Sequence, residues 1–393
     1  MYRIIGQMTP IVGLGRTISL ANATRPCFHR GFLSPNHLYV QRAIRTHAPK
    51  PIKLAFAFDI DGVLVHDNQA IPAGQRVLKF LDGANPLKLS IPYILITNGG
   101  GRTEFERATA LSSILQHKIS PDHLVQSHTV LKSVVDKYHN KGVLVLGGLE
   151  GIKDVAHGYG FKHVYTSHDL LRIVPGIWPF SSTSSPSSSS TSTYPDIPYL
   201  PKPISAIFVF HDPRDWGRDI QIILDVLRSP PSETEPVELI FTNPDLIWKA
   251  LHPKPRLGQG AFREAFQGVY RAFYGKQYPY VQFGKPSRDT YVFAEGVLRG
   301  MLRKNEEGAK GTDAIWSEII PLQQVRASFS IMARLIAQPD FFTGASAHGW
   351  PSILVRTGVY DPSNGEPAHE PTKIAEDVEE AVMWAWEREY GKQ

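Results

Sequence analysis

The chain has 393 residues, of which 42% are hydrophobic and 20% charged. This composition excludes a wholly disordered or fibrous protein, and the length suits two to three domains. The single cysteine, Cys27, excludes an internal disulfide and a Cys-x-x-Cys metal or redox motif. The apolar segments have the length of strands, so we expect no integral membrane segment.

The net charge of +5 is unevenly distributed along the chain. Residues 1–58 carry eight basic and no acidic side chains, which leaves 34 basic against 37 acidic side chains in the remainder. A mildly acidic folded part argues against nucleic acid as a partner. An arginine-rich, acid-free leader without a compact apolar region is typical of a mitochondrial transit peptide. We therefore predict a transit peptide or disordered leader over residues 1–50 and a mitochondrial location, in the matrix.

Segments with strand character alternate with segments with helix character, which predicts an α/β protein with a largely parallel sheet. The expected strands are 52–58, 93–96, 142–146, 204–210, 237–241 and 353–355. The expected helices are 103–116, 129–138, 218–227, 260–274, 290–303 and 376–389. Residues 181–203 are dominated by Ser, Thr and Pro, so we expect a disordered surface loop there.

The strongest local signal is Asp59-Ile60-Asp61-Gly62, directly after the first expected strand. Ligands of open α/β sheets bind at the carboxyl ends of the strands, where both carboxylates would project. One carboxylate can attack a phosphorus centre while the other handles the proton, provided that a metal and cationic groups offset the repulsion between anions. The alternative reading is a pair of loop carboxylates that cap the next helix.

Two further motifs suit the same chemistry. Thr97-Asn98-Gly99 follows the second expected strand and offers a hydroxyl, an amide and backbone N–H groups to phosphate oxygens. Lys285 lies in Phe283-Gly284-Lys285-Pro286, where an ammonium would neutralise a nucleophile and a transferring phosphoryl group. Taken alone, the first motif would more often be an ordinary turn, and the second a surface lysine.

The ordered set of D-x-D-G-V-L, I-T-N-G and G-K-P resembles the haloacid dehalogenase superfamily of aspartate-nucleophile phosphatases. The long insertion before the third motif resembles the α/β cap of subfamily IIA, and further motifs resemble a mitochondrial branch of it, the cat-eye-syndrome critical region type. The resemblance implies a Rossmann-like core with a parallel sheet and an inserted class-2A cap. The implied domains are 51–139 for the first part of the core, 140–277 for the cap and 278–393 for the second part of the core.

The same resemblance implies the site residues. Asp59 would be the nucleophile and a metal ligand, and Asp61 the general acid and base that lends its backbone carbonyl to Mg²⁺. Thr97, Asn98 and Gly99 would bind phosphate, and Lys285 would be the third-motif lysine, which completes the catalytic set.

The family's fourth motif, an acidic loop that supplies further carboxylates to Mg²⁺, departs from the pattern here. Anchored on the Gly344-Ala345-Ser346 turn, the comparison with the family pattern puts Ile336 and Phe341 where acids belong, with Asp340 as the remaining candidate metal ligand. Mg²⁺ is poorly held by one or two carboxylates unless the substrate phosphate completes its shell. Either the site has decayed, or an altered exon boundary has changed residues 325–343 of the coding sequence.

These observations favour a mitochondrial Mg²⁺-dependent phosphatase-type hydrolase that acts on a small phosphorylated substrate through an aspartyl-phosphate intermediate. The alternative is a catalytically impaired protein of the same fold that acts by binding or regulation, with a link to glycerophospholipid metabolism. Capped members of this subfamily often form dimers through the cap, so the resemblance also implies a homodimer.

Overall fold

The structure is a computed structural model, and its described residues all belong to one unit of contacts. The described residues are 52–148, 151–174, 176–180, 200–232, 234–248, 252, 254–307, 331–336, 349–358 and 370–391, with only the backbone described for 305–307 and 331–336. The leader 1–50, the serine-rich stretch 181–199 and Asp340 therefore lie outside the described residues.

The core is a parallel sheet of six strands in the order β15-β14-β13-β1-β4-β5. β1 is buried along its whole length because helices cover both faces, which explains its uninterrupted apolar sequence. The strand order reverses beside β1, and ligands bind at such switch points. The strands are β1 (Leu54–Phe58), β4 (Tyr93–Ile96), β5 (Leu124–Val125), β13 (Ile331–Ile336), β14 (Ser352–Val355) and β15 (Lys373–Ala375).

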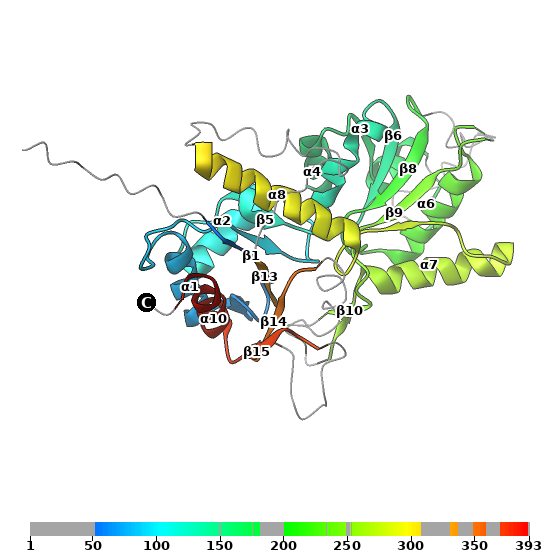
Figure 1. The fold of residues 1–393 in the computed structure, drawn as a ribbon. Helices are drawn as coiled ribbons and strands as arrows, with labels where there is room; N and C mark the ends of the chain where they lie inside the picture. Colours follow the sequence, from blue (N-terminus) through cyan, green and yellow to red (C-terminus); the bar gives the residue numbers. More distant parts are fainter. Residues whose placement is uncertain are drawn as a thin grey trace, which may run out of the picture. The chain divides into compact units, whose positions relative to one another are not determined.

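Successive side chains of β1 point to opposite faces of the core sheet. Phe56 and Phe58 pack in one apolar cluster with α1 and α10, which lie side by side in Figure 1. Ala55 and Ala57 face a second cluster that includes α8. The helical elements around this sheet are α1 (Pro72–Leu81), α2 (Glu104–Leu115), η1 (Pro121–His123), η2 (Thr129–Ser133), α3 (Val135–Tyr138), α8 (Arg288–Glu307) and α10 (Val378–Tyr390).

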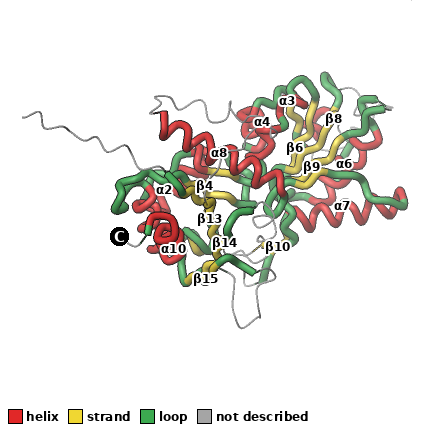
Figure 2. Tube along the Cα trace, in the orientation of Figure 1, coloured by secondary structure: helices red, strands yellow, loops and turns green. Residues whose placement is uncertain are grey.

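A second parallel sheet of five strands, in the order β12-β9-β8-β6-β7, is inserted between β5 and α8 in the sequence. Figure 2 shows helices flanking this sheet as they flank the first. Its elements are β6 (Gly142–Leu146), α4 (Ile152–Tyr159), β7 (His163–Tyr165), α5 (Ser167–Ile173), β8 (Ile204–Val209), α6 (Trp216–Arg228), β9 (Glu238–Phe241), α7 (Gln259–Tyr274) and β12 (Val281–Gln282). We refer to this inserted unit, residues 142–282, as the cap.

Two short antiparallel ribbons complete the described structure: β2 (Val65–His66) with β3 (Gln69–Ala70), and β10 (Ile247–Trp248) with β11 (Arg256–Leu257). Within the described part of the chain, no helix is both long and apolar enough to cross a membrane.

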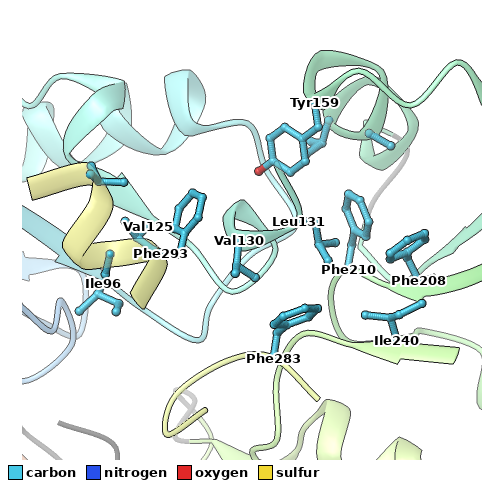
Figure 3. Close-up of a cluster of buried hydrophobic side chains, with 14 of the residues drawn as sticks. Ile96, Val125, Val130, Leu131, Tyr159, Phe208, Phe210, Ile240, Phe283 and Phe293 are labelled. Atoms are coloured by element: carbon cyan, nitrogen blue, oxygen red, sulfur yellow. The ribbon is translucent and has the colours of Figure 1, made fainter. Parts of the chain in front are cut away.

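One apolar cluster runs from the core into the cap (Figure 3). It contains Ile96 and Val125 from the core sheet, Phe208 from β8, Phe210 just after β8, and Phe283 just after β12. A shared apolar core of this kind holds the two sheets together.

The α/β class with two parallel sheets confirms the expected fold. All six expected strands are present, with ends shifted by at most two residues. The helix expected over 129–138 is wrong, because the structure has the 3-10 turn η2 followed by the short helix α3. Thr129 there bonds Gln126 and Glu104 through its hydroxyl, while Val130 and Leu131 are buried, so tertiary contacts hold the tighter turn.

Candidate active site

Asp59 and Lys285 form a buried ion pair at the carboxyl end of β1. The Lys285 Nζ lies 3.0 Å from Asp59 Oδ1 and donates to the Ile96 carbonyl, at the end of β4, at 3.2 Å. The Asp59 carboxylate also accepts the Ile60 N–H at 2.9 Å. Lys285 is 1% exposed and Asp59 is 5% exposed, so both charges are held away from water and the attraction between them offsets part of that cost.

The turn that carries Lys285 approaches the cap strand β9 closely. Phe283 N–H donates to the Phe241 carbonyl at 2.8 Å, and Gly284 N–H donates to the Thr290 hydroxyl at 3.0 Å. Gly284 has a φ of +89°, and a Cβ there would lie 2.2 Å from the Thr242 carbonyl oxygen. Only glycine suits this position, and the turn that it allows sets the position of the next residue, Lys285.

The side-chain amide of Asn98 forms hydrogen bonds with both backbone groups of Lys285. Its Oδ1 accepts the Lys285 N–H at 2.8 Å, and its Nδ2 donates to the Lys285 carbonyl and to Asp245 Oδ1, both at 3.0 Å. An amide group has two N–H donors, and both are used here. Phosphate binding by Asn98 stays a prediction, and in this arrangement it would use the backbone N–H or displace Asp245.

Thr97 and Gly99 lie in the turn after β4. Thr97 Oγ1 accepts the Gly99 N–H at 3.0 Å, and the Thr97 N–H donates to the Val125 carbonyl of β5 at 3.0 Å. At Gly101, with φ of +86°, a Cβ would lie 2.5 Å from the His211 ring of the cap. The glycines therefore permit the cap to approach this turn.

Asp61 has an exposed side chain in the turn that follows Asp59. Partial removal of its carboxyl group from water by the surrounding protein raises the pKa of Asp61, and the negative charge of Asp59 raises it further. The positive charges of Arg107 and Lys285 lower it. A carboxyl group whose pKa lies above its ordinary value keeps its proton to a higher pH, which suits a general acid.

The cap contributes Asp245, whose carboxylate contacts Asn98. Burial raises the pKa of Asp245 to about 6, although the Asn98 hydrogen bond and the charge of Lys285 lower it; the charges of Asp59 and Asp212 raise it. Sequence reasoning assigned Asp245 no role. Its position just after β9, at the carboxyl end of a cap strand, was the available signal.

We expect Asp245→Asn to stabilise the protein at neutral and higher pH. Asp245 binds a proton more tightly in the folded chain (pKa about 6) than at the ordinary value of 3.8, so its favourable contribution at low pH is lost as the pH rises through about 6. The loss is at most about 3 kcal/mol. Asparagine keeps the oxygen that accepts from Asn98 without this loss.

Urea unfolding of both proteins at several pH values checks this expectation. The variant should gain stability over the wild type at about pH 8 and show no gain at about pH 4. A gain of equal size at both values would contradict the assignment of the effect to this carboxyl group.

Two further polar atoms of the cap are buried at this site. His211 Nδ1 and Asp212 Oδ1 have no hydrogen-bond partner among the described residues. Burial lowers the pKa of His211 to about 4, with the nearby charges of Arg214 and Arg107 acting in the same direction. Buried polar atoms of native proteins are normally paired, so an unpaired imidazole nitrogen and carboxylate oxygen indicate a place for a polar partner.

A buried polar chain connects the cap to the glycine turn. His128 Nε2 accepts the Gly101 N–H at 3.1 Å, so its Nδ1 carries the ring proton and donates to the Tyr159 oxygen at 2.6 Å. Tyr159 then donates to Glu104 Oε1 at 2.6 Å. Burial lowers the pKa of His128 to about 4, so the imidazole is neutral and suited to accept. Sequence reasoning missed this chain, whose members show no shared spacing.

We expect Tyr159→Phe to lower the free energy of unfolding by about 1–3 kcal/mol, because it leaves the buried His128 Nδ1–H without its acceptor and removes one of the hydrogen bonds that Glu104 Oε1 accepts. Chemical denaturation measures this. Tyr274→Phe is the matched control, since the Tyr274 hydroxyl accepts from Arg228 at an exposed position and its loss should change stability by less than about 0.5 kcal/mol. Equal losses in both variants would contradict a special role for the buried chain.

The fourth-motif region lies only partly inside the described residues. β13 pairs with β1 in the register Phe58 to Leu335, so the backbone of Ile336 follows at the level of Asp59. Asp340 lies outside the described residues. Within the described part of the chain, no group of three or more His, Cys, Asp or Glu side chains is arranged to hold a metal ion.

Comparisons with known proteins agree with this architecture. A family model of haloacid dehalogenase-like hydrolases matches residues 56–162, and a related hydrolase-like model matches residues 342–381. A mitochondrial hydrolase of Saccharomyces cerevisiae is 36% identical over 86% of this chain and 96% of its own length. A fusion of cardiolipin synthase with a mitochondrial hydrolase in Schizosaccharomyces pombe is 34% identical over 84% of this chain and 53% of its own length.

The solved structure of the p-nitrophenyl phosphatase from Archaeoglobus fulgidus has the same fold, with a TM-score of 0.56 and 18% identity over 85% of this chain and all of that one. The match to the yeast hydrolase extends over both parts of the core and the cap between them. The chain therefore belongs to the haloacid dehalogenase superfamily of hydrolases, with the inserted α/β cap of subfamily IIA.

Proposed function

We propose that this chain is a phosphatase-type hydrolase that releases phosphate from a small organic phosphate monoester. The observation that supports this most directly is the buried pair of Asp59 and Lys285 at the carboxyl end of β1. A carboxylate held beside an ammonium, with little access for bulk water, suits attack on an anionic phosphorus centre.

The proposed reaction has two steps. An Asp59 oxygen attacks phosphorus, the P–O bond to the substrate breaks, and Asp61 gives its proton to the departing oxygen. Asp61 then takes a proton from water, which attacks the aspartyl-phosphate, releases inorganic phosphate and restores Asp59. The Lys285 ammonium offsets the charge that builds up between the two anions.

Phosphate oxygens would be held by the Thr97 hydroxyl and the Asn98 backbone N–H, and by the Gly99 N–H once it exchanges its bond to Thr97 Oγ1 for the phosphate. The unpaired atoms of His211 and Asp212 would meet the leaving group, because the cap brings His211 against the turn at Gly101 and Asp212 follows it directly in the chain. A neutral imidazole and a carboxylate suit a substrate with hydroxyl or amino groups.

The described donors fit Mg²⁺. The Asp59 carboxylate and the Asp61 backbone carbonyl are hard oxygen ligands, and Mg²⁺ is commonly bound by one or two carboxylates with water and substrate phosphate in the remaining positions. The ion would supply charge neutralisation at the phosphoryl oxygens. Asp340 remains the candidate for a further carboxylate.

A phosphate-release assay tests the proposal. The protein should hydrolyse p-nitrophenyl phosphate or another small phosphate monoester with Mg²⁺ present, and EDTA should remove the activity. Absence of release from every monoester in a broad panel, with the protein folded, would contradict it.

The position of Ile336 favours a second candidate, a chain that binds a phosphorylated compound without turnover. The metal shell would then lack a carboxylate at the strand beside Asp59. Inorganic phosphate should still bind in this case, which calorimetry detects, while the assay above shows no release.

The two fungal relatives support a mitochondrial location, since both names contain a mitochondrial hydrolase. The fusion with cardiolipin synthase supports the suggested link to glycerophospholipid metabolism. Import of the full chain into isolated mitochondria, with and without residues 1–50, tests the location. A homodimer stays a prediction that sedimentation can check.

A further inference from the structure

The ribbon of residues 246–257, which contains β10 and β11, exposes large apolar side chains beside the candidate site. Leu246 is 53% exposed, Ile247 57%, Trp248 43% and Leu257 61%. Ile247 pairs with Leu257 and Trp248 with Arg256 in the antiparallel register, so the four side chains belong to one small structure. Neighbouring exposed apolar side chains of this kind commonly mark an interaction surface, whereas single ones do not.

The base of the ribbon is anchored at the site. Gly258 N–H donates to the Leu246 carbonyl at 2.8 Å, and Gly260 N–H donates to the Asp245 carbonyl at 2.9 Å. Asp245 itself contacts Asn98 of the core. The apolar side chains are exposed although this contact between cap and core is already formed, so among the described residues the approach of the cap to the core does not cover them.

The charge of the ribbon limits what can cover it. The described residues of the ribbon include no Asp or Glu, but they include His252, Lys254 and Arg256, all of them exposed. A symmetric contact with a second copy would place these basic groups against each other. The leader is equally unsuited as an occupant, because it carries only basic charges.

We propose that this ribbon docks on an anionic membrane surface and thereby holds the candidate site next to the lipid headgroups. Tryptophan, leucine and isoleucine favour the boundary between headgroups and acyl chains, and lysine and arginine reach anionic headgroups beside them. Lys254 and Arg256 are both exposed on the same ribbon. Membrane docking goes beyond the proposed hydrolysis and requires no turnover, so either proposal can fail while the other holds.

Flotation of the full chain with vesicles tests this inference. Binding should be stronger to phosphatidylcholine vesicles that contain phosphatidylglycerol than to phosphatidylcholine alone, and it should weaken as salt is added. Lys254→Glu with Arg256→Glu should weaken binding on the order of tenfold or more. Ile247→Ser with Trp248→Ser should have an effect of about the same size. Phe273→Ser, at a 65% exposed site on α7, is the matched control and should change binding less than about twofold.

Because the basic leader is itself expected to attract anionic vesicles, a second measurement reports on the ribbon alone. Phosphatidylcholine with brominated acyl chains should quench tryptophan fluorescence of the wild type, and Trp248→Phe should remove most of that quenching. The leader contains no tryptophan.

Three results would overturn the inference. The first is equal vesicle binding by the wild type and both ribbon double variants. The second is quenching that Trp248→Phe leaves unchanged. The third is a wild-type dimer that the Ile247→Ser and Trp248→Ser double variant converts to a monomer, since a second copy would then cover the ribbon.

Discussion

Asp59→Asn is expected to reduce phosphate release by at least about a thousandfold, because the amide cannot form the aspartyl-phosphate on which the proposed reaction depends. A steady-state assay with Mg²⁺ measures the loss. The same substitution removes one negative charge from beside the phosphate site, so inorganic phosphate should bind at least as tightly as to the wild type. The combination of lost turnover and retained binding separates a chemical role for Asp59 from general damage to the site.

Asp67→Asn is the matched control for this experiment. Asp67 is exposed in the turn between β2 and β3 and has a φ of 49°, which asparagine also accepts. It should keep wild-type turnover and a stability within about 0.5 kcal/mol of the wild type. Turnover by Asp59→Asn at a rate close to that of Asp67→Asn would refute the proposed nucleophile.

The fold follows from the sequence where burial is complete. β1, β4 and β6 are buried at every position, so their sequences are unbroken apolar runs that predict strands of a parallel sheet. β13 lies between β1 and β14, yet Ile331–Ile336 includes Arg334 and did not stand out as a strand. Its assignment depends on pairing with neighbours that are distant in the sequence.

The site was predictable where each residue follows a strand. Asp59 and Lys285 were expected together from motifs far apart in the sequence, and the structure brings them to 3.0 Å. The hydrogen bonds of the Asn98 side chain with Lys285 and Asp245 depend on the approach of the cap to the core. No local pattern encodes that approach, and the same holds for the His128 and Tyr159 chain.

Lys285→Met is expected to abolish turnover and to destabilise the fold by about 3–5 kcal/mol. Methionine fills a similar volume, but it leaves the buried Asp59 carboxylate without a counter-charge and the Ile96 carbonyl without its donor. Urea unfolding in EDTA measures the effect, since a bound divalent cation would also compensate Asp59.

The double variant Asp59→Asn with Lys285→Met distinguishes the loss of the pair from the loss of packing. If the cost arises from one unpaired buried charge, removing the second charge should restore most of the stability that Lys285→Met loses, while turnover stays absent. A double variant whose loss equals the sum of the two single losses would show that the residues act independently. The proposed site requires the opposite, because attack by a carboxylate on an anionic phosphoryl group depends on the ammonium held against it.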